Sequence, residues 1–227
     1  MGELMMHYTE IDARPIGEGH AAGPSGGLYP RVFKRILDCG LVLLAAPIII
    51  PAILLLGLLI RWDGGPAFYS QERIGMNGRV FRIWKLRSMI PGADRMLEQY
   101  LASNPDARAE WESTQKLKDD PRVTPIGRVI RRSSIDELPQ LWTVFSGDMS
   151  LVGPRPMMPD QADLYPGAAY YGLRPGITGF WQISRRNGTS FAGRAAYDTR
   201  YARRLSFGTD LRVLVATVWV VLRGTGY

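Results

Sequence analysis

The feature that most constrains this chain is a long uncharged segment interrupted by two prolines. Residues 39–60 contain no charged side chain, and an α-helix of roughly 20 such residues is long enough to cross a bilayer. Pro47 and Pro51 stand about one helical turn apart inside this segment. Pro51 has no N–H to donate to the carbonyl of Pro47, and its ring crowds that carbonyl, so we expect a kink near the middle.

The flanks of the segment do not decide its orientation. Arg31, Lys34 and Arg35 precede it and Arg61 follows it, so the positive-inside rule favours neither end. A broken, re-entrant helix over residues 31–62, with both ends on the cytoplasmic side, satisfies both the charge pattern and the prolines. A kinked helix that spans the membrane is the second interpretation, and a helix buried in a soluble core is the third.

The composition excludes several kinds of chemistry from the rest of the chain. Both histidines, His7 and His20, lie within residues 1–30, a stretch rich in Gly and Pro that we predict to be a flexible leader. Residues 63–227 then contain no imidazole, which excludes a Ser-His-Asp triad and the usual zinc sites there. The single cysteine rules out an intrachain disulfide.

The net charge of +7 is unevenly distributed. The leader carries four acidic residues against one arginine, so the excess of positive charge lies in the remainder, where most cations are arginines. Arginine binds phosphate in a planar, two-pronged geometry that lysine does not reproduce. This favours a polyanionic partner, namely a nucleotide, a phospholipid surface or a nucleic acid; an arginine-rich genome is the alternative explanation.

From residue 63 the sequence is typical of a small α/β domain that is mostly helical. Residues 67–70 and 79–84 are predicted to form a β-hairpin around the turn at 76–78. Helices are expected over residues 94–115, with a break at Asn104-Pro105, over 126–141 and over 211–222. We expect the charged helices at 94–115 to form a solvated cover or lid.

The densest group of charges is centred on Asp136 and Glu137, which follow Arg131 and Arg132. On a continuous helix Arg132 and Asp136 would lie four residues apart on one face. This pattern fits either a catalytic cluster or an exposed helix with ion pairs of little energetic consequence. A second acidic pair, Asp119-Asp120, precedes a proline in a polar stretch, and we assign it to a loop without a functional role.

Two arginines occur in rigid turns. Arg155 stands between Pro154 and Pro156, and Arg174 begins a Gly- and Pro-rich loop. Prolines fix the backbone around a guanidinium, which suits phosphate binding at low entropic cost, although a surface turn is the ordinary alternative. The sequence has neither a Walker A loop nor a dinucleotide fingerprint after a strand, so nucleotide binding would have to use arginines and a metal.

Taken together, these pieces resemble the bacterial sugar transferases, the monotopic polyprenyl-phosphate phosphoglycosyl transferases. The similarity covers residue 31 to the end, and residues 186–188 and 206–207 are most similar to members that initiate exopolysaccharide repeat units. After the basic start and the proline-broken segment, the matching motifs occur in the family's order: 71–75 (QERIG), 85–89 (KLRSM), 134–140 (SIDELPQ), 147–156 (GDMSLVGPRP) and 174–179 (RPGITG).

The resemblance implies an enzyme of the bacterial inner membrane with its catalytic domain, residues 63–227, on the cytoplasmic face. Such an enzyme transfers a sugar-1-phosphate from a UDP-sugar to undecaprenyl phosphate and releases UMP, with Mg²⁺ as cofactor. The narrower similarity implies a hexose, galactose or glucose. It also implies membrane phospholipid and other exopolysaccharide assembly proteins as partners, and no nucleic acid.

The resemblance also implies roles for individual residues. Asp136 would be the nucleophile of a ping-pong reaction, and Glu137 would hold Mg²⁺ with it or assist the second attack. Positions that match the basic residues of the family motifs would bind phosphate or substrate, namely Lys85, Arg87, Arg131, Arg155 and Arg174.

One departure from the family concerns the membrane break. The family often has Ser-Pro at the break, whereas here Ile50 precedes Pro51 and Pro47 is additional.

Two other functions compete with the transferase. A glycosidase with paired carboxylates fits poorly, because adjacent residues on a helix point about 100° apart. A membrane-anchored scaffold or polyanion-binding protein without enzymatic activity is the main alternative.

Overall fold

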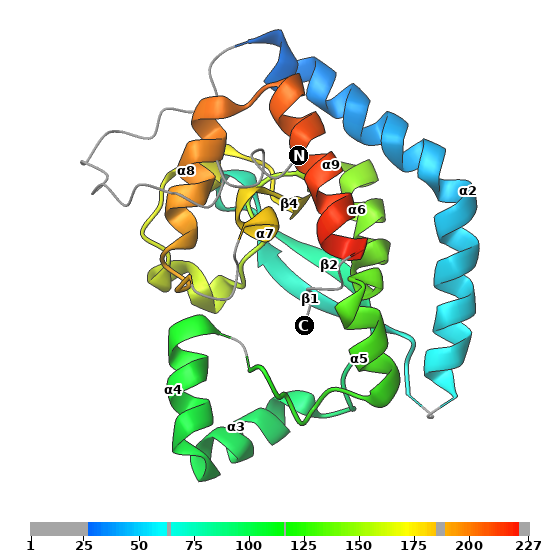
Figure 1. Ribbon diagram of the computed structural model, residues 1–227, viewed down its shortest axis with the longest axis vertical. Helices are drawn as coiled ribbons and strands as arrows, with labels where there is room; N and C mark the ends of the chain where they lie inside the picture. The colour runs from blue at the N-terminus through cyan, green and yellow to red at the C-terminus, as the bar shows by residue number, and fades with distance from the viewer. Residues whose placement is uncertain (1–26, 63–64, 116, 185–188, 223–227) are drawn as a thin grey trace.

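The structure is a computed structural model that describes residues 27–62, 65–115, 117–184 and 189–222 (Figure 1). Most of the predicted leader, residues 1–30, therefore lies outside the described residues. In chain order the elements are a π-helical turn η1 (Tyr29–Phe33), α2 (Lys34–Arg61), β1 (Phe68–Ile74), η2 (Met76–Gly78), β2 (Val80–Leu86), α3 (Ala93–Ser103), α4 (Pro105–Thr114), α5 (Pro125–Arg132), η3 (Ile135–Gln140), α6 (Leu141–Ser146), β3 (Ser150–Val152), η4 (Pro159–Leu164), η5 (Ala169–Gly172), β4 (Gly176–Thr178), α7 (Phe180–Ile183), α8 (Arg194–Arg204) and α9 (Phe207–Leu222).

The predicted hairpin is confirmed and is longer than expected. Strands β1 and β2 pair antiparallel from Phe68 opposite Leu86 to Ile74 opposite Val80. At the turn, Asn77 adopts a φ of 59°, a left-handed conformation that Asn tolerates better than most residues. A second sheet, in which β3 and β4 pair in parallel, was not predicted, since three residues give no readable alternation.

The helical predictions are confirmed except in one place. The break between α3 and α4 falls at Asn104, whose side chain accepts a hydrogen bond from the N–H of Ala107 at 3.1 Å and caps α4. The helical region predicted over residues 126–141 is helical but not continuous. α5 ends at Arg132, Ser134 adopts a left-handed φ of 55°, and the chain continues as the 3₁₀ helix η3.

Helix α2 lies along the outside of the body. Figure 1 shows that its ribbon bends about midway along its length, and Pro47 and Pro51 lie inside the helix. Residues 29–61 form the one helix, within the described parts of the chain, that is long and apolar enough to cross a membrane, and 11% of its apolar window is buried. This exposure argues against a core helix, while the re-entrant and spanning arrangements both stay predictions.

Buried polar contacts fix the N-terminal end of α2 to the body. Lys34 Nζ lies 2.6 Å from Asp210 Oδ2, and the hydroxyl of Tyr29 donates to the same oxygen at 2.7 Å. The hydroxyl of Tyr201 donates to the other oxygen at 2.7 Å. A buried charge is tolerated when it is paired and hydrogen-bonded in this way. The contact therefore joins η1, α2, α8 and α9 at one point.

The other end of α2 is tied to the hairpin. Arg87, which directly follows β2, donates from Nη2 to the carbonyl of Ile60 in the last turn of α2 at 3.0 Å. Such carbonyls have no partner within their own helix. The backbone of α5 also approaches this region closely, because a Cβ on Gly127 would lie 1.9 Å from the carbonyl oxygen of Ser88.

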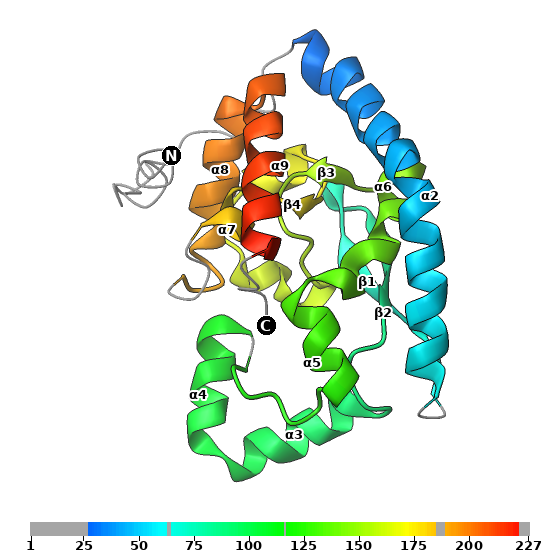
Figure 2. The same ribbon diagram turned by 45° about the vertical axis from the view of Figure 1, so that its right-hand side comes forward.

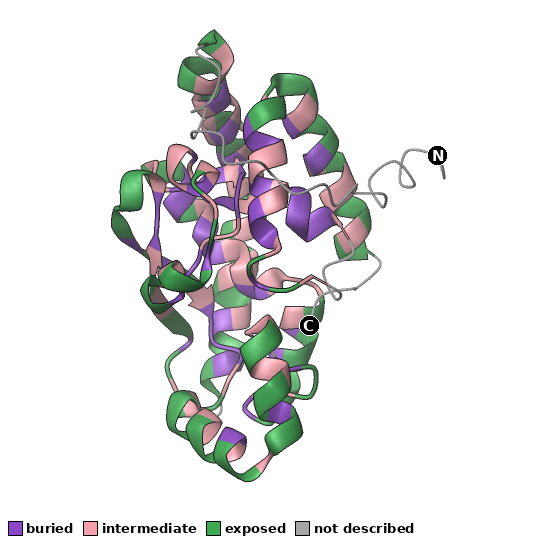
Figure 3. Ribbon diagram, turned by 90° about the vertical axis from the view of Figure 1, so that its left-hand side faces the viewer, coloured by how far each residue is buried: buried purple, intermediate pink, exposed green. Residues whose placement is uncertain are grey.

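The body and the helical arm differ in burial. Figure 3 shows buried residues concentrated in the middle of the molecule, whereas the arm formed by α3 and α4 is mostly exposed or intermediate. Figures 1 and 2 place this arm beyond the end of the hairpin, beside α5. The arm has its own small core, formed by Leu101, Ala107 and Leu117. The exposed, charged arm matches the predicted cover, and its position next to the hairpin leaves space between the two.

We expect Gly153→Ala to lower the melting temperature of the purified protein. A Cβ there would lie 2.3 Å from the carbonyl oxygen of Arg174 and 2.8 Å from the N of Gly176. Both atoms are backbone atoms just before and at the start of β4, which cannot give way easily, so the cost should be about 1–3 kcal/mol. Gly208→Ala is the matched control, because nothing lies within 4 Å of its Cβ position. An unchanged melting temperature for Gly153→Ala would contradict the close packing of the two strands.

Candidate active site

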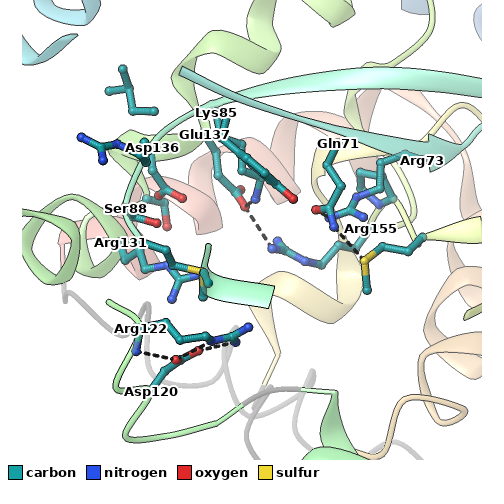
Figure 4. Close-up of a pocket in the computed structure, with 18 of the residues that line it drawn as sticks. Gln71, Arg73, Lys85, Ser88, Asp120, Arg122, Arg131, Asp136, Glu137 and Arg155 are labelled. Carbon is teal, nitrogen blue, oxygen red and sulfur yellow. Dashed lines mark hydrogen bonds and ion pairs between the residues drawn. The ribbon is translucent and has the colours of Figure 1, made fainter. Parts of the chain in front are cut away.

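A cavity of about 940 Å³ opens between the hairpin, η3 and the helical arm. Figure 4 shows the side chains that face it. Three predicted groups converge on it from segments far apart in the sequence: Lys85 from β2, Arg131 with Asp136 and Glu137 from the α5–η3 junction, and Arg155 from the loop after β3.

The break between α5 and η3 places the two carboxylates. Ser134 adopts a left-handed conformation that ends the α-helical geometry of α5, and Asp136 and Glu137 lie in the first turn of η3 against β2. The predicted same-face pairing of Arg132 with Asp136 is therefore wrong, because no helix continues between them. Of the two adjacent arginines, Arg131 lines the cavity with Asp136 and Arg132 does not.

Glu137 is held by two cations. Its Oε1 lies 2.7 Å from Lys85 Nζ and 2.9 Å from Arg155 Nη2. Burial alone would raise the pKa of Glu137, but the charges and hydrogen bonds of Arg155 and Lys85 outweigh it and hold the pKa well below its usual range. Glu137 is therefore ionised, and its carboxylate fixes two basic side chains at the edge of the cavity.

Asp136 lies in a different environment although it is the adjacent residue. Only 6% of it is exposed, and burial raises its pKa, as does the charge of Glu137, while Lys85, Arg131 and Arg155 oppose the rise. No ion pair or hydrogen bond in the described part of the chain engages its carboxylate. The carboxylate of Asp136 thus faces the cavity unpaired, where its oxygens are placed to act as a nucleophile or a ligand.

A buried ion pair that the sequence did not reveal lies beside Arg131. Arg122 donates from Nε and Nη2 to the two oxygens of Asp120 at 2.8 and 2.6 Å. The guanidinium of Arg122 also lies 5.6 Å from the ring centre of Trp111 on α4. Asp119-Asp120 does lie in a loop, as predicted, and Asp120 lines the cavity while paired with Arg122.

The other predicted phosphate-binding arginines have structural contacts. Arg87 borders the cavity, but its Nη2 donates to the carbonyl of Ile60 in α2. Arg174 donates from Nε to the carbonyl of Gly147 at 3.0 Å and is not among the residues that line the cavity. The structure therefore brings Lys85, Arg131 and Arg155 together with the two carboxylates but leaves Arg174 apart from them.

Three further residues of the cavity had no assigned role in the sequence. Gln71 and Arg73 belong to the 71–75 motif on β1, and Arg194 begins α8. The 71–75 motif contains the first two, and as alternate residues of β1 their side chains lie on one face of the strand. No local sequence pattern indicated Arg194, which reaches the cavity only through tertiary packing.

The donor set fits a magnesium ion only in part. In the residues that the structure describes, no group of three His, Cys, Asp or Glu side chains could enclose a metal. Asp136 and Glu137 offer two carboxylates, and Mg²⁺ is commonly held by one or two carboxylates together with substrate phosphate oxygens and water. The site is therefore suited to a metal that arrives with a diphosphate, with Asp136 as the carboxylate not already paired to cations.

Known proteins match the chain over most of its length. The family model described as "Bacterial sugar transferase" matches residues 29–224. The exopolysaccharide production protein ExoY of Sinorhizobium fredii is 44% identical over 211 residues, which is 92% of this chain and 92% of that protein.

Two further relatives carry names that describe reactions. The undecaprenyl-phosphate galactose phosphotransferase of Salmonella typhimurium is 42% identical over 92% of this chain and 44% of its own length. The UDP-glucose:undecaprenyl-phosphate glucose-1-phosphate transferase of Caulobacter vibrioides is 39% identical over 96% of this chain and 80% of its own length. The chain therefore belongs to the bacterial sugar transferase family, and it is a phosphoglycosyl transferase.

Proposed function

We propose that this protein transfers a sugar-1-phosphate from a UDP-sugar to undecaprenyl phosphate and releases UMP. The observation that carries the proposal is the buried Asp136 beside a Glu137 that holds Lys85 and Arg155 within 3 Å. Phosphoryl transfer requires positioned positive charge around the phosphate more than any other contribution from the protein. Two relatives with 42% and 39% identity bear names for this kind of reaction.

The first half-reaction uses Asp136 as the nucleophile. A carboxylate oxygen of Asp136 attacks the β-phosphorus of the UDP-sugar. The bond from that phosphorus to the bridging oxygen breaks, and the bridging oxygen leaves with UMP and takes the electron pair. The product is a sugar-phosphate ester on Asp136, and no proton has to move. This agrees with the absence of histidine from residues 63–227.

The second half-reaction restores the enzyme. A phosphate oxygen of undecaprenyl phosphate attacks the phosphorus of the aspartyl ester, the bond to Asp136 breaks, and the carboxylate is regenerated. Lys85, Arg131 and Arg155 carry the positive charge that the equatorial phosphate oxygens need in both steps. Glu137 keeps Lys85 and Arg155 in place, so that these cations need not reorganise as the reaction proceeds.

We propose Mg²⁺ as the cofactor and a hexose as the sugar. Mg²⁺ bound to the diphosphate would offset its negative charge, and Asp136 with Glu137 would supply the protein ligands. Galactose and glucose are both named among the relatives, and we expect one of them here, in the first membrane step of exopolysaccharide repeat-unit synthesis.

Helix α2 supports a location at the cytoplasmic face of the inner membrane. Its apolar side chains are mostly exposed, and the two ends of the helix are fixed to the body by the contacts of Lys34 and Arg87. Both ends of a membrane helix attached to one soluble body favour the re-entrant arrangement, because a body on one side of the bilayer cannot hold both ends of a straight span.

We expect Asp136→Asn to abolish transfer, by about a thousandfold or more, because the amide cannot form the ester. Wild-type protein incubated with UDP-galactose or UDP-glucose and Mg²⁺, without lipid, should show a hexose-phosphate adduct on Asp136 by mass spectrometry, and the variant should show none. Asp119→Asn is the control, since Asp119 is exposed in the nearby loop. Full activity in Asp136→Asn would refute the mechanism.

As the pH is lowered, the rate of adduct formation should begin to fall at a higher pH than it would if the nucleophile were an aspartate with an ordinary pKa. Burial raises the pKa of Asp136, so the nucleophilic, ionised form is lost earlier as the pH decreases. Lys85→Met should move this acid limb to still higher pH, because the lysine charge favours the ionised form. A pH profile of UMP release measures both effects, and an acid limb that Lys85→Met leaves in place or lowers would contradict the assignment.

Cysteine labelling tests the re-entrant arrangement. In a Cys39→Ala background, Leu28→Cys and Trp62→Cys place single thiols at exposed positions before and after α2. A membrane-impermeant maleimide applied to intact spheroplasts should label neither variant, and permeabilised cells should be labelled in both. Labelling of one variant alone in intact spheroplasts would show that α2 spans the membrane.

A further inference from the structure

The 71–75 motif contributes an arginine whose role the proposed chemistry does not explain. Arg73 lines the cavity next to Arg155, as Figure 4 shows. Its Nη2 donates to Gln71 Oε1 at 2.5 Å and its Nη1 to the carbonyl of Glu72 at 3.3 Å. Both acceptors are neutral. Burial, followed by the charge of Arg155, lowers the pKa of Arg73 to about 10.

A second unexplained arginine reaches the same part of the cavity from α8. Arg194 is 9% exposed and lies between two rings, 4.3 Å from the ring centre of Trp181 and 4.5 Å from that of Phe191. These rings fix the plane of its guanidinium. Its Nε is buried and has no hydrogen-bond partner in the described part of the chain. Burial and then the charge of Arg155 lower the pKa of Arg194 to about 10.

The carboxylates near these arginines do not balance their charge. Arg155 shares Glu137 with Lys85. Asp198, one turn after Arg194 on α8, accepts a hydrogen bond from the hydroxyl of Tyr165 at 2.6 Å, and burial raises its pKa to about 7. Three guanidinium groups that repel one another are thus held together in a cavity wall, an arrangement that a bound anion would stabilise.

We infer that Arg73, Arg155 and Arg194 form a binding site for a phosphate monoester that both half-reactions use. The inference rests on the proposed function. In each half-reaction the phosphorus lies between Asp136 and a second phosphate, in line with both. The phosphate that leaves as UMP and the lipid phosphate that attacks must therefore occupy the same place, opposite Asp136. The site binds these two monoesters in turn.

The wall beside this site suits the arrival of a lipid. Thr217 and Val221 of α9 line the same cavity, and Thr217 Oγ1 lies 2.6 Å from Thr178 Oγ1 of β4. On its outer face α9 exposes apolar side chains, including Trp219 and Leu222. A lipid phosphate could enter past the end of α9, with its long hydrocarbon chain lying against this apolar surface.

Equilibrium binding of UMP to the full-length protein in nanodiscs tests the site without turnover. Arg194→Met removes the charge and keeps most of the side-chain volume between the rings, and we expect it to weaken UMP binding about 10- to 100-fold. Uridine, which has no phosphate, should bind Arg194→Met and wild type equally. Arg194→Lys should restore binding in part, since it keeps the charge but not the planar group. Arg203→Met is the control, because Arg203 is exposed on the same helix.

Single-turnover measurements then separate the two uses of the site. Arg194→Met and Arg73→Met should raise the concentration of UDP-sugar needed for adduct formation and that of undecaprenyl phosphate needed for adduct discharge. UMP should compete with undecaprenyl phosphate in the discharge step. Wild-type UMP binding in both variants, or an effect on only one half-reaction, would overturn the shared site. If wild type forms no adduct at all, the proposed function fails, and UMP binding still reports on the arginines.

Discussion

The arrangement of this site depends on one carboxylate that binds two cations. Glu137 lies 2.7 Å from Lys85 Nζ and 2.9 Å from Arg155 Nη2, and these three residues come from η3, β2 and the loop after β3. Removing one partner of these partly buried pairs would leave a charge without its full compensation, which is destabilising. The three segments are therefore held in one geometry by charge, in a region where the two short sheets alone provide little cohesion.

The same body also fixes the apolar helix α2 relative to the site. Arg87 follows Lys85 by two residues on the hairpin and binds the carbonyl of Ile60 at the end of α2. The opposite end of α2 is attached through Lys34 to the buried Asp210 of α9. If α2 lies in a bilayer, as proposed, these few polar contacts would fix the depth of the cavity relative to the lipid surface.

The sequence predicted the elements with strong local signals and missed the contacts that only packing creates. Alternation and the Asn-Gly turn indicated the hairpin, and Asn104-Pro105 indicated the break between α3 and α4. The interruption of the helical region at residues 126–141 has a local cause. Ser134 adopts a left-handed conformation there, and the sequence has no glycine at this position to indicate it. Arg122 with Asp120, and Arg194 between Trp181 and Phe191, join segments far apart in the chain, so no spacing rule could have linked them to Asp136.

The two adjacent carboxylates lie in opposite environments, which distinguishes two roles that the sequence alone did not distinguish. Glu137 is ionised and its Oε1 is paired with two cations, whereas Asp136 has its pKa raised by burial and makes no such pair. Two adjacent cations draw electron density from a carboxylate and make it the weaker nucleophile. An unpaired one next to those cations can attack a phosphorus atom whose oxygens they hold. The environment, more than the residue type, therefore supports the proposal that Asp136 attacks and that Glu137 positions the cations.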